Sequence, residues 1–152
     1  MTTENTIYYF SDKKLTSYND KIGCKIGSTC NRISRFKIDR IGWSFIPKIT
    51  IFDISNENCY NIDGKINEIY NNARLNTLGS NGGTEFYDSE ILSLDELRKF
   101  FKDNEINFEE SLLSDEDIKK ICSNDYDIDY NALKYDDKQI RNYRNKIINI
   151  TN

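Results

Sequence analysis

Alternating apolar and polar positions predict two β-strands near the beginning of the chain. The residues from Asn5 to Ser11 are mostly β-branched or aromatic, the side chains that strands favour. From Lys21 to Ser28, apolar side chains alternate with lysines and glycines, which is the period of a strand with one buried face. We expect the two strands to pair antiparallel across the polar, turn-like segment 12–20, with Lys25 facing solvent.

Helical and extended patterns continue beyond these strands. Thr29 is placed to cap a short helix that begins near Cys30. β-forming residues return from Ser44 to Ile54 and predict a third strand. Apolar residues then recur every three or four positions between Asn61 and Arg74, which predicts an amphipathic helix with Asn61 as its N-cap. A glycine-rich turn and a short extended segment from Thr84 to Tyr87 follow.

Serine-led capping boxes predict two further helices toward the C-terminus. Ser93 with Glu96 precedes an amphipathic stretch, and Ser114 with Asp117 gives a weaker form of the same signal. Aromatic residues in this part of the chain are typical of core packing and not of a base-stacking platform. The aromatic residues that we expect in the core are Phe100, Phe101 and Phe108.

These elements predict an α/β fold of the α+β kind, a small three-stranded, mainly antiparallel sheet flanked by helices. We assign this domain to residues 1–110. Residues 111–152 are predicted to form an acidic, mainly helical C-terminal extension, with a last, basic helix over 138–150.

Composition places the 152-residue chain among folded proteins, since 38% of its residues are hydrophobic and 12% aromatic. No run of eighteen apolar residues occurs and the beginning lacks the features of a signal peptide, so we expect no membrane span. The four cysteines form no CxxC pair, which indicates the cytoplasm or another reducing intracellular compartment. Because the chain contains no histidine, any catalysis must use tyrosine, lysine, arginine or carboxylates.

Charge is divided unevenly along the chain, although the net charge is only −4. Residues 1–50 contain nine Lys or Arg against four Asp or Glu, and the remainder contains twelve against twenty-one. A basic half is the side of a protein that attracts phosphates. Residues 1–50 are therefore the candidate phosphate-facing side.

Two tripeptides on the predicted strands resemble the motifs of the GIY-YIG nuclease superfamily. Thr6-Ile7-Tyr8 and Lys25-Ile26-Gly27 each differ from the family motif at one position. Arg35 follows Gly27 by eight residues, on the predicted first helix, where the family carries its catalytic arginine. This spacing makes the resemblance more specific than the tripeptides alone.

A second block, Ile62 to Tyr87, is similar to the acidic helix and "GTEF" ending of a phage and giant-virus branch of the superfamily. In that branch the metal-binding acid opens the helix, and Asp63 occupies the matching position. Glu68 and Glu85 are rival ligands. The resemblance would place the protein in the host cytoplasm if it is viral.

The resemblance implies a metal-dependent DNA endonuclease that hydrolyses phosphodiester bonds. Tyr8 would orient or deprotonate water, Arg35 would neutralise the phosphate, and Lys25 would assist Tyr8. Asp63 would hold Mg²⁺ or Mn²⁺, and one carboxylate supplemented by waters and a phosphate oxygen suits Mg²⁺. Each residue also has an ordinary structural explanation, as a core aromatic, a surface cation or a charge in the first turn of a helix.

Two alternatives remain open from the sequence. The first is a noncatalytic DNA-binding module on the same fold, in which basic residues of the first helix grip phosphates: Arg32, Arg35, Lys37 and Arg40. The second is a protein-interaction or defence-evasion factor that uses the acidic C-terminal half.

Overall fold

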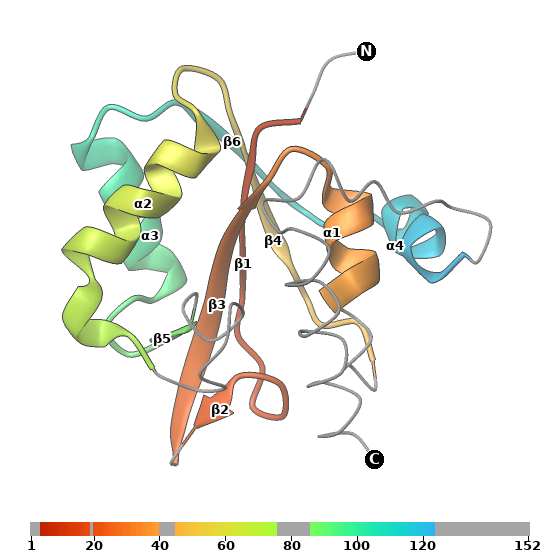
Figure 1. The fold of residues 1–152 in the computed structure, drawn as a ribbon, viewed down its shortest axis with the longest axis horizontal. Helices are drawn as coiled ribbons and strands as arrows, with labels where there is room; N and C mark the ends of the chain where they lie inside the picture. Colours follow the sequence, from red (N-terminus) through yellow and green to blue (C-terminus); the bar gives the residue numbers. More distant parts are fainter. Residues whose placement is uncertain (1–3, 19, 40–44, 76–85, 124–152) are drawn as a thin grey trace, which may run out of the picture.

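The computed structural model describes residues 4–18, 20–39, 45–75 and 86–123, and these residues form an α+β fold (Figure 1). The fold class is as predicted, but the sheet has six strands where three were expected. The strands are β1 (Thr6–Phe10), β2 (Ser17–Tyr18), β3 (Lys21–Thr29), β4 (Thr50–Ile54), β5 (Phe86–Asp88) and β6 (Phe108–Leu112). The helices are α1 (Arg32–Asp39), α2 (Cys59–Ile69), α3 (Leu94–Asp103) and α4 (Asp115–Cys122), with a 3₁₀ turn, η2 (Asn71–Ala73).

The sheet is antiparallel at every strand pair, in the order β2-β3-β1-β4-β6, and β5 also pairs with β3. The predicted pairing of the first two long strands is confirmed, with Tyr8 opposite Gly27. On its other side, Tyr8 lies opposite Ile51 of β4. Strand β1 is therefore interior to the sheet, and all five of its residues are buried.

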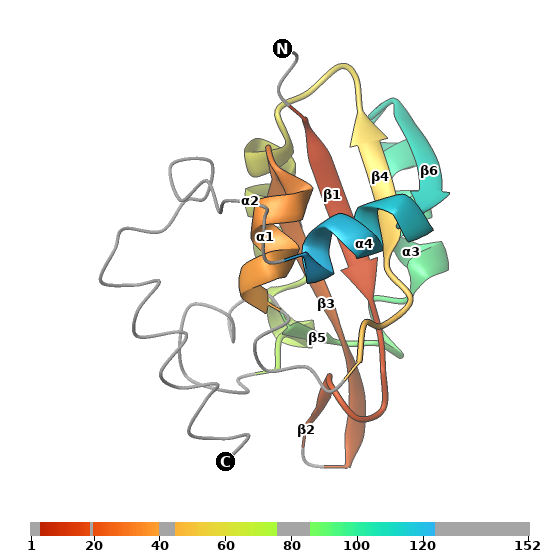
Figure 2. The same ribbon diagram turned by 90° about the vertical axis from the view of Figure 1, so that its right-hand side faces the viewer.

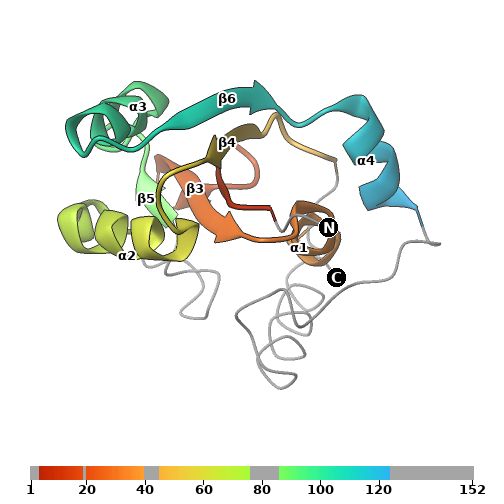
Figure 3. The same cartoon turned by 90° about the horizontal axis from the view of Figure 1, so that it is seen from above.

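Helices cover both faces of the sheet. Helices α2 and α3 lie on one face, and α1 and α4 lie side by side on the other, as Figures 2 and 3 show. Successive residues of β1 point to opposite faces, so Ile7 and Tyr9 join the core under α2 and α3, while Tyr8 and Phe10 join the core under α1 and α4. The protein thus has two hydrophobic cores divided by one sheet.

Helix caps decide where the helices begin. The capping boxes at Ser93 and Ser114 are confirmed, since each hydroxyl accepts a hydrogen bond of 3.1 Å from the backbone N–H three residues on. The other two predicted caps are wrong. Asn31, and not Thr29, caps α1, and Asn58, and not Asn61, caps α2, because each asparagine oxygen accepts from a backbone N–H of the first turn.

Strand β6 was not predicted and changes the organisation of the C-terminal part. It pairs with β4 along its whole length, and the predicted boundary after residue 110 falls inside it. Leu113 and Ile121 are buried in the core that contains Phe36 of α1. Residues 111–123 are therefore part of the same folded unit, while the predicted helix over 138–150 lies outside the described residues.

The strand predicted from Ser44 is shorter than expected, since residues 45–49 are not in a strand and β4 begins at Thr50. The segment predicted from Thr84 to Tyr87 contains β5, Phe86–Asp88, and its first two residues lie outside the described residues. No helix in the described part of the chain is long and apolar enough to cross a membrane.

Candidate phosphodiester site

Tyr8 and Arg35 are joined by a buried hydrogen bond on the α1 face of the sheet. The Nε–H of Arg35 donates to the phenolic oxygen of Tyr8 over 3.0 Å. Tyr8 is 0% exposed and Arg35 is 4% exposed. The next residue of α1, Phe36, sets its ring edge-on to that of Tyr8, with the centroids 4.9 Å apart. Two consecutive residues of α1 thus fix both the ring and the hydroxyl of Tyr8.

Gly27 is required because the ring of Tyr8 lies across its backbone. A Cβ atom at Gly27 would be 2.3 Å from the phenolic oxygen of Tyr8 and 2.4 Å from Cζ. The other glycine of the repeated Lys-Ile-Gly sequence, Gly23, is constrained by different atoms, since its Cβ would be 2.6 Å from the carbonyl oxygen of Thr16. Only the second of the two tripeptides therefore serves the Tyr8–Arg35 pair.

Lys25 lies on the same face of β3 as Gly27, two residues before it. Its side chain is 2% exposed, so the predicted solvent orientation is wrong. Alternation predicts exposure only where one face of a sheet is open, and helices cover both faces here. The ammonium nitrogen lies 5.9 Å from the ring centroid of Phe86, a cation–π contact with the neighbouring strand. The structure thus places Tyr8, Lys25 and Arg35 on one face.

Asp63, the predicted metal ligand, lies on the opposite face. Its Oδ2 atom accepts a hydrogen bond of 3.0 Å from the hydroxyl of Ser28. Ser28 pairs with Ile7 and therefore faces α2, not α1. A cation held by Asp63 would be separated from the Tyr8–Arg35 pair by the sheet.

The two alternative metal ligands, Glu68 and Glu85, do not provide a described carboxylate next to Tyr8. Glu68 belongs to α2 as well and is exposed, and Glu85 lies outside the described residues. Within the described ranges, no cluster of three or more His, Cys, Asp or Glu side chains is arranged to hold a metal ion. Asp63 therefore does not fit the role of a metal ligand for chemistry at Tyr8.

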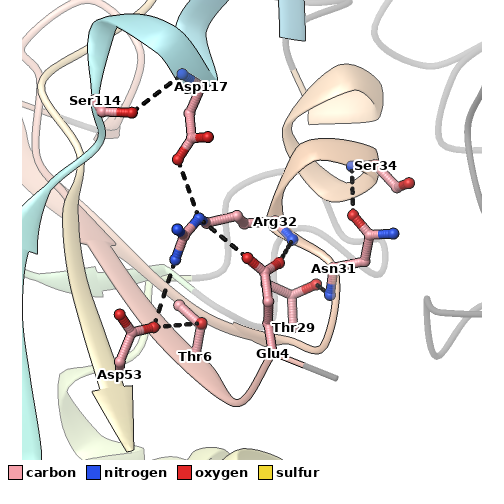
Figure 4. A network of polar contacts seen from close by, with 9 residues as sticks. All are labelled: Glu4, Thr6, Thr29, Asn31, Arg32, Ser34, Asp53, Ser114 and Asp117. Atoms are coloured by element: carbon pink, nitrogen blue, oxygen red, sulfur yellow. Dashed lines mark hydrogen bonds and ion pairs between the residues drawn. The ribbon is translucent and has the colours of Figure 1, made fainter. Parts of the chain in front are cut away.

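Arg32, one of the predicted DNA-binding residues, is surrounded by carboxylates (Figure 4). Its guanidinium forms ion pairs with Glu4 at 3.2 Å, Asp53 at 3.4 Å and Asp117 at 3.2 Å. Its backbone N–H donates to Glu4 as well, over 2.7 Å. These partners come from the segment before β1, from β4 and from α4, so Arg32 joins three parts of the chain.

The other predicted DNA-binding residues are Lys37 and Arg40. Lys37 is 8% exposed, and its ammonium group donates to the backbone carbonyl of Ser123, the residue that follows α4. Arg40 lies outside the described residues. The two α1 cations Arg32 and Lys37 thus both contact α4 or the residue after it.

Groups on the α2 face are held neutral by burial. The hydroxyl of Tyr9 donates to the carbonyl of Leu92 over 3.2 Å, and burial raises the pKa of Tyr9 far above its ordinary value. Burial also raises the pKa of Cys24 to about 12. All four cysteines are free thiols, and Cys24 and Cys59 are buried. The two buried thiols on this face, Cys24 and Cys59, are therefore protonated at neutral pH.

Sequence reasoning did not place Phe36 or Ser28 at the site. Phe36 is an apolar residue of the first helix, and nothing in the sequence signalled that its ring would pack on Tyr8. Ser28 had no distinguishing signal, because its bond to Asp63 joins residues 35 positions apart.

Comparisons with protein-family models, curated proteins and solved structures find no match for this chain.

Proposed function

We propose that the protein is a metal-dependent DNA endonuclease that hydrolyses phosphodiester bonds at the site formed by Tyr8, Lys25 and Arg35. The observation that carries the proposal is the 3.0 Å hydrogen bond from Arg35 to the buried phenolic oxygen of Tyr8. The GIY-YIG resemblance implies the same two residues, Tyr8 and Arg35.

Burial of two cations beside a phenol supports a functional explanation. Removing an ammonium or guanidinium group from water is costly unless other groups compensate for the lost hydration. Lys25 and Arg35 are almost completely buried on one face of the sheet, together with the phenol of Tyr8. Buried charged groups gathered with a titratable side chain are typical of sites where an anion is bound or stabilised.

The geometry suits the roles that phosphodiester hydrolysis needs. A guanidinium has five N–H donors in a planar fork that suits bidentate binding of a phosphate, and Arg35 uses its Nε–H toward Tyr8. Because the phenolic oxygen of Tyr8 is the acceptor in that bond, its own proton is directed away from Arg35. Tyr8 is 0% exposed and Arg35 is 4% exposed, so a phosphate and a water reach this pair only when the segments that cover it move. Lys25 adds positive charge on the same face.

For the metal ligand we propose Glu85 in place of Asp63. Asp63 and Glu68 both belong to α2, across the sheet from Tyr8. Glu85 lies outside the described residues, so its choice follows from the exclusion of the other two acids. It is the remaining ligand among the three acids considered.

Cleavage of DNA by arginine variants tests the proposal. Supercoiled DNA is incubated with the full-length protein and Mg²⁺ or Mn²⁺, and nicking is followed on a gel. We expect Arg35→Gln to lose at least about 100-fold in rate, as when one transition-state donor is removed. Arg98→Gln is the matched control, because Arg98 pairs with Asp95 and Glu110 on α3 and β6. Equal cleavage by both variants would contradict the assignment of Arg35.

Carboxylate variants test the metal ligand in the same assay. We expect Glu85→Gln to abolish cleavage at every Mg²⁺ or Mn²⁺ concentration. Asp63→Asn should keep the wild-type rate, since its partner is Ser28 on the other face. The reverse result would return the role to Asp63 and would mean that the sheet does not separate the two sites.

The second candidate is a noncatalytic DNA-binding module, favoured by the separation of Asp63 from Tyr8 and Arg35. In EDTA, such a module would still bind DNA, with an affinity that falls steeply as salt increases because counterions are released. Binding without cleavage in any metal would select the module. No binding to DNA would leave the protein-interaction factor.

A further inference from the structure

We propose that α4 is an autoinhibitory element that occupies the cations of α1 and competes with DNA for them. The inference rests on the proposed function, because it concerns access of DNA to the α1 face. Its basis is the contact between α1 and α4, which lie side by side on one face of the sheet (Figure 2).

Acidic and carbonyl oxygens of the α4 region take the place of phosphate oxygens at both ends of α1. Asp117 of α4 forms an ion pair with the guanidinium of Arg32 at 3.2 Å (Figure 4). The carbonyl oxygen of Ser123, immediately after α4, accepts a hydrogen bond from the ammonium group of Lys37. Arg32 and Lys37 are on α1 on either side of Arg35. A DNA backbone that reached this helix would need the same donors.

Apolar packing keeps α4 in place over the same face. Ile121 of α4 is 0% exposed, and Leu113, just before the helix, is buried beside it. Both belong to the core that contains Tyr8 and Phe36. Docking of α4 therefore contributes to the burial of the core around Tyr8, and release of α4 would remove Asp117 from Arg32 and Ser123 from Lys37 and expose part of that core.

The electrostatic part of the contact is tested with two matched variants of the full chain. Asp117→Asn removes the charge that faces Arg32. Glu116→Gln removes one charge from the neighbouring position, where the carboxylate is 80% exposed and pairs only loosely with Lys120 at 3.8 Å. Both variants change the net charge equally. Any increase in DNA affinity that comes only from the less negative net charge is therefore the same in both.

The measurement is binding of a short fluorescent DNA duplex in EDTA at low salt. We expect Asp117→Asn to bind about two- to fivefold tighter than Glu116→Gln, the value of one partly exposed ion pair. We also expect DNA to increase hydrogen exchange of the α4 amides in the wild-type protein, with no such increase in α3. Asp117→Glu should restore wild-type affinity.

Ile121→Ala tests the packing without any change of charge. It should weaken docking of α4 and raise DNA affinity, whereas Leu112→Ala, at a side chain with 53% exposure, should not. Circular dichroism confirms that each variant is folded, and thermal denaturation shows whether only α4 has been released.

The outcomes separate the inference from the function on which it rests. Equal DNA affinity of Asp117→Asn and Glu116→Gln, with unchanged exchange of α4 on DNA binding, overturns autoinhibition and leaves DNA binding intact. Failure of wild type and all variants to bind DNA overturns both the DNA function and the inference. Autoinhibition by α4 is supported if Asp117→Asn binds DNA more tightly than Glu116→Gln and Ile121→Ala binds it more tightly than Leu112→Ala.

Discussion

The two faces of the sheet use similar residues for different purposes. Under α2 and α3 the core is aromatic and apolar, with Phe52 packed edge-on against Phe101 and Phe108 at centroid distances of 5.1 and 5.6 Å. Under α1 and α4 the buried set also includes Lys25 and Arg35. One face is an ordinary core, and the other combines a core with buried positive charge.

Tyr8 and Tyr9 show the difference most directly. They are consecutive residues of β1, both are buried, and both hydroxyls are hydrogen-bonded. Tyr9 donates to the carbonyl of Leu92, which satisfies a buried hydroxyl and does no more. Tyr8 accepts from the guanidinium of Arg35. Which face a residue occupies, and not its type, separates the candidate site from the scaffold.

Among changes that compare the two faces of the sheet, the largest expected effect comes from removal of the Tyr8 hydroxyl. We expect Tyr8→Phe to slow metal-dependent DNA cleavage by about 10²- to 10⁴-fold, as when a general base or water-orienting group is lost. The ring and its packing on Phe36 are kept. Tyr9→Phe makes the same chemical change one residue along and should leave the cleavage rate unchanged.

Stability provides the control for this pair. Each substitution removes one buried hydrogen bond, so each should lower the free energy of unfolding by about 0.5–1.5 kcal/mol. Urea denaturation measures that change and shows whether either variant is misfolded. If Tyr9→Phe loses as much activity as Tyr8→Phe, the two faces are not functionally distinct.

The strength of local signals explains which elements the sequence predicted. Both capping boxes, at Ser93 and Ser114, were predicted because a serine three residues before an acid satisfies backbone N–H groups locally. Strand β6 was not predicted, because Glu109, Glu110 and Ser111 have low strand propensity. Pairing with β4 overrides that propensity at the edge of the sheet.

The sequence predicted part of the arrangement of the candidate residues. The spacing of Gly27 and Arg35 identified residues that do meet at Tyr8, since a strand followed by a short helix leaves little freedom between them. Asp63 follows a longer connection, and its face depends on how α2 crosses the sheet. The face is decided by Ile62 and Ile66, which form the apolar side of α2 and pack into the core under α2 and α3.

An intermediate effect is expected from the glycine beneath Tyr8. Gly27→Ala would place a methyl group within 2.3 Å of the phenolic oxygen, so the ring must move away from Arg35. We expect a loss of about 1–3 kcal/mol in the free energy of unfolding, typical of an overpacked core, together with slower cleavage. Urea denaturation and the DNA-nicking assay measure the two effects.

Gly64 provides the contrasting substitution. It lies in α2, and a Cβ atom there would meet nothing within 4 Å. Gly64→Ala should therefore stabilise the protein by roughly 0.4–1 kcal/mol, because alanine restricts the unfolded chain and favours the helix. A similar destabilisation by both substitutions would show that Gly27 is not constrained by Tyr8.

The smallest expected effect concerns the ion pair between α3 and β6, on the side of the molecule away from α1. Arg98 donates to both carboxylate oxygens of Glu110, over 2.7 and 2.6 Å. These hydrogen bonds hold the pKa of Glu110 below its ordinary value. A lowered pKa in the folded state stabilises the protein above the unfolded pKa of about 4.3, and this stabilisation is lost as pH falls through the folded pKa.

Glu110→Gln should therefore lower the free energy of unfolding at pH 7 and have little effect at acid pH. Both side chains are about one-third exposed, at 33% for Arg98 and 31% for Glu110, so solvent screening limits the pair to about 0.2–1 kcal/mol. Glu109→Gln, at the exposed neighbouring position, should change stability less at either pH. Urea denaturation at pH 7 and at about pH 3, below the pKa values of free carboxylates, measures the difference. A deficit for Glu110→Gln that persists undiminished at the lower pH would mean that side-chain packing, and not the charge on Glu110, joins α3 to β6.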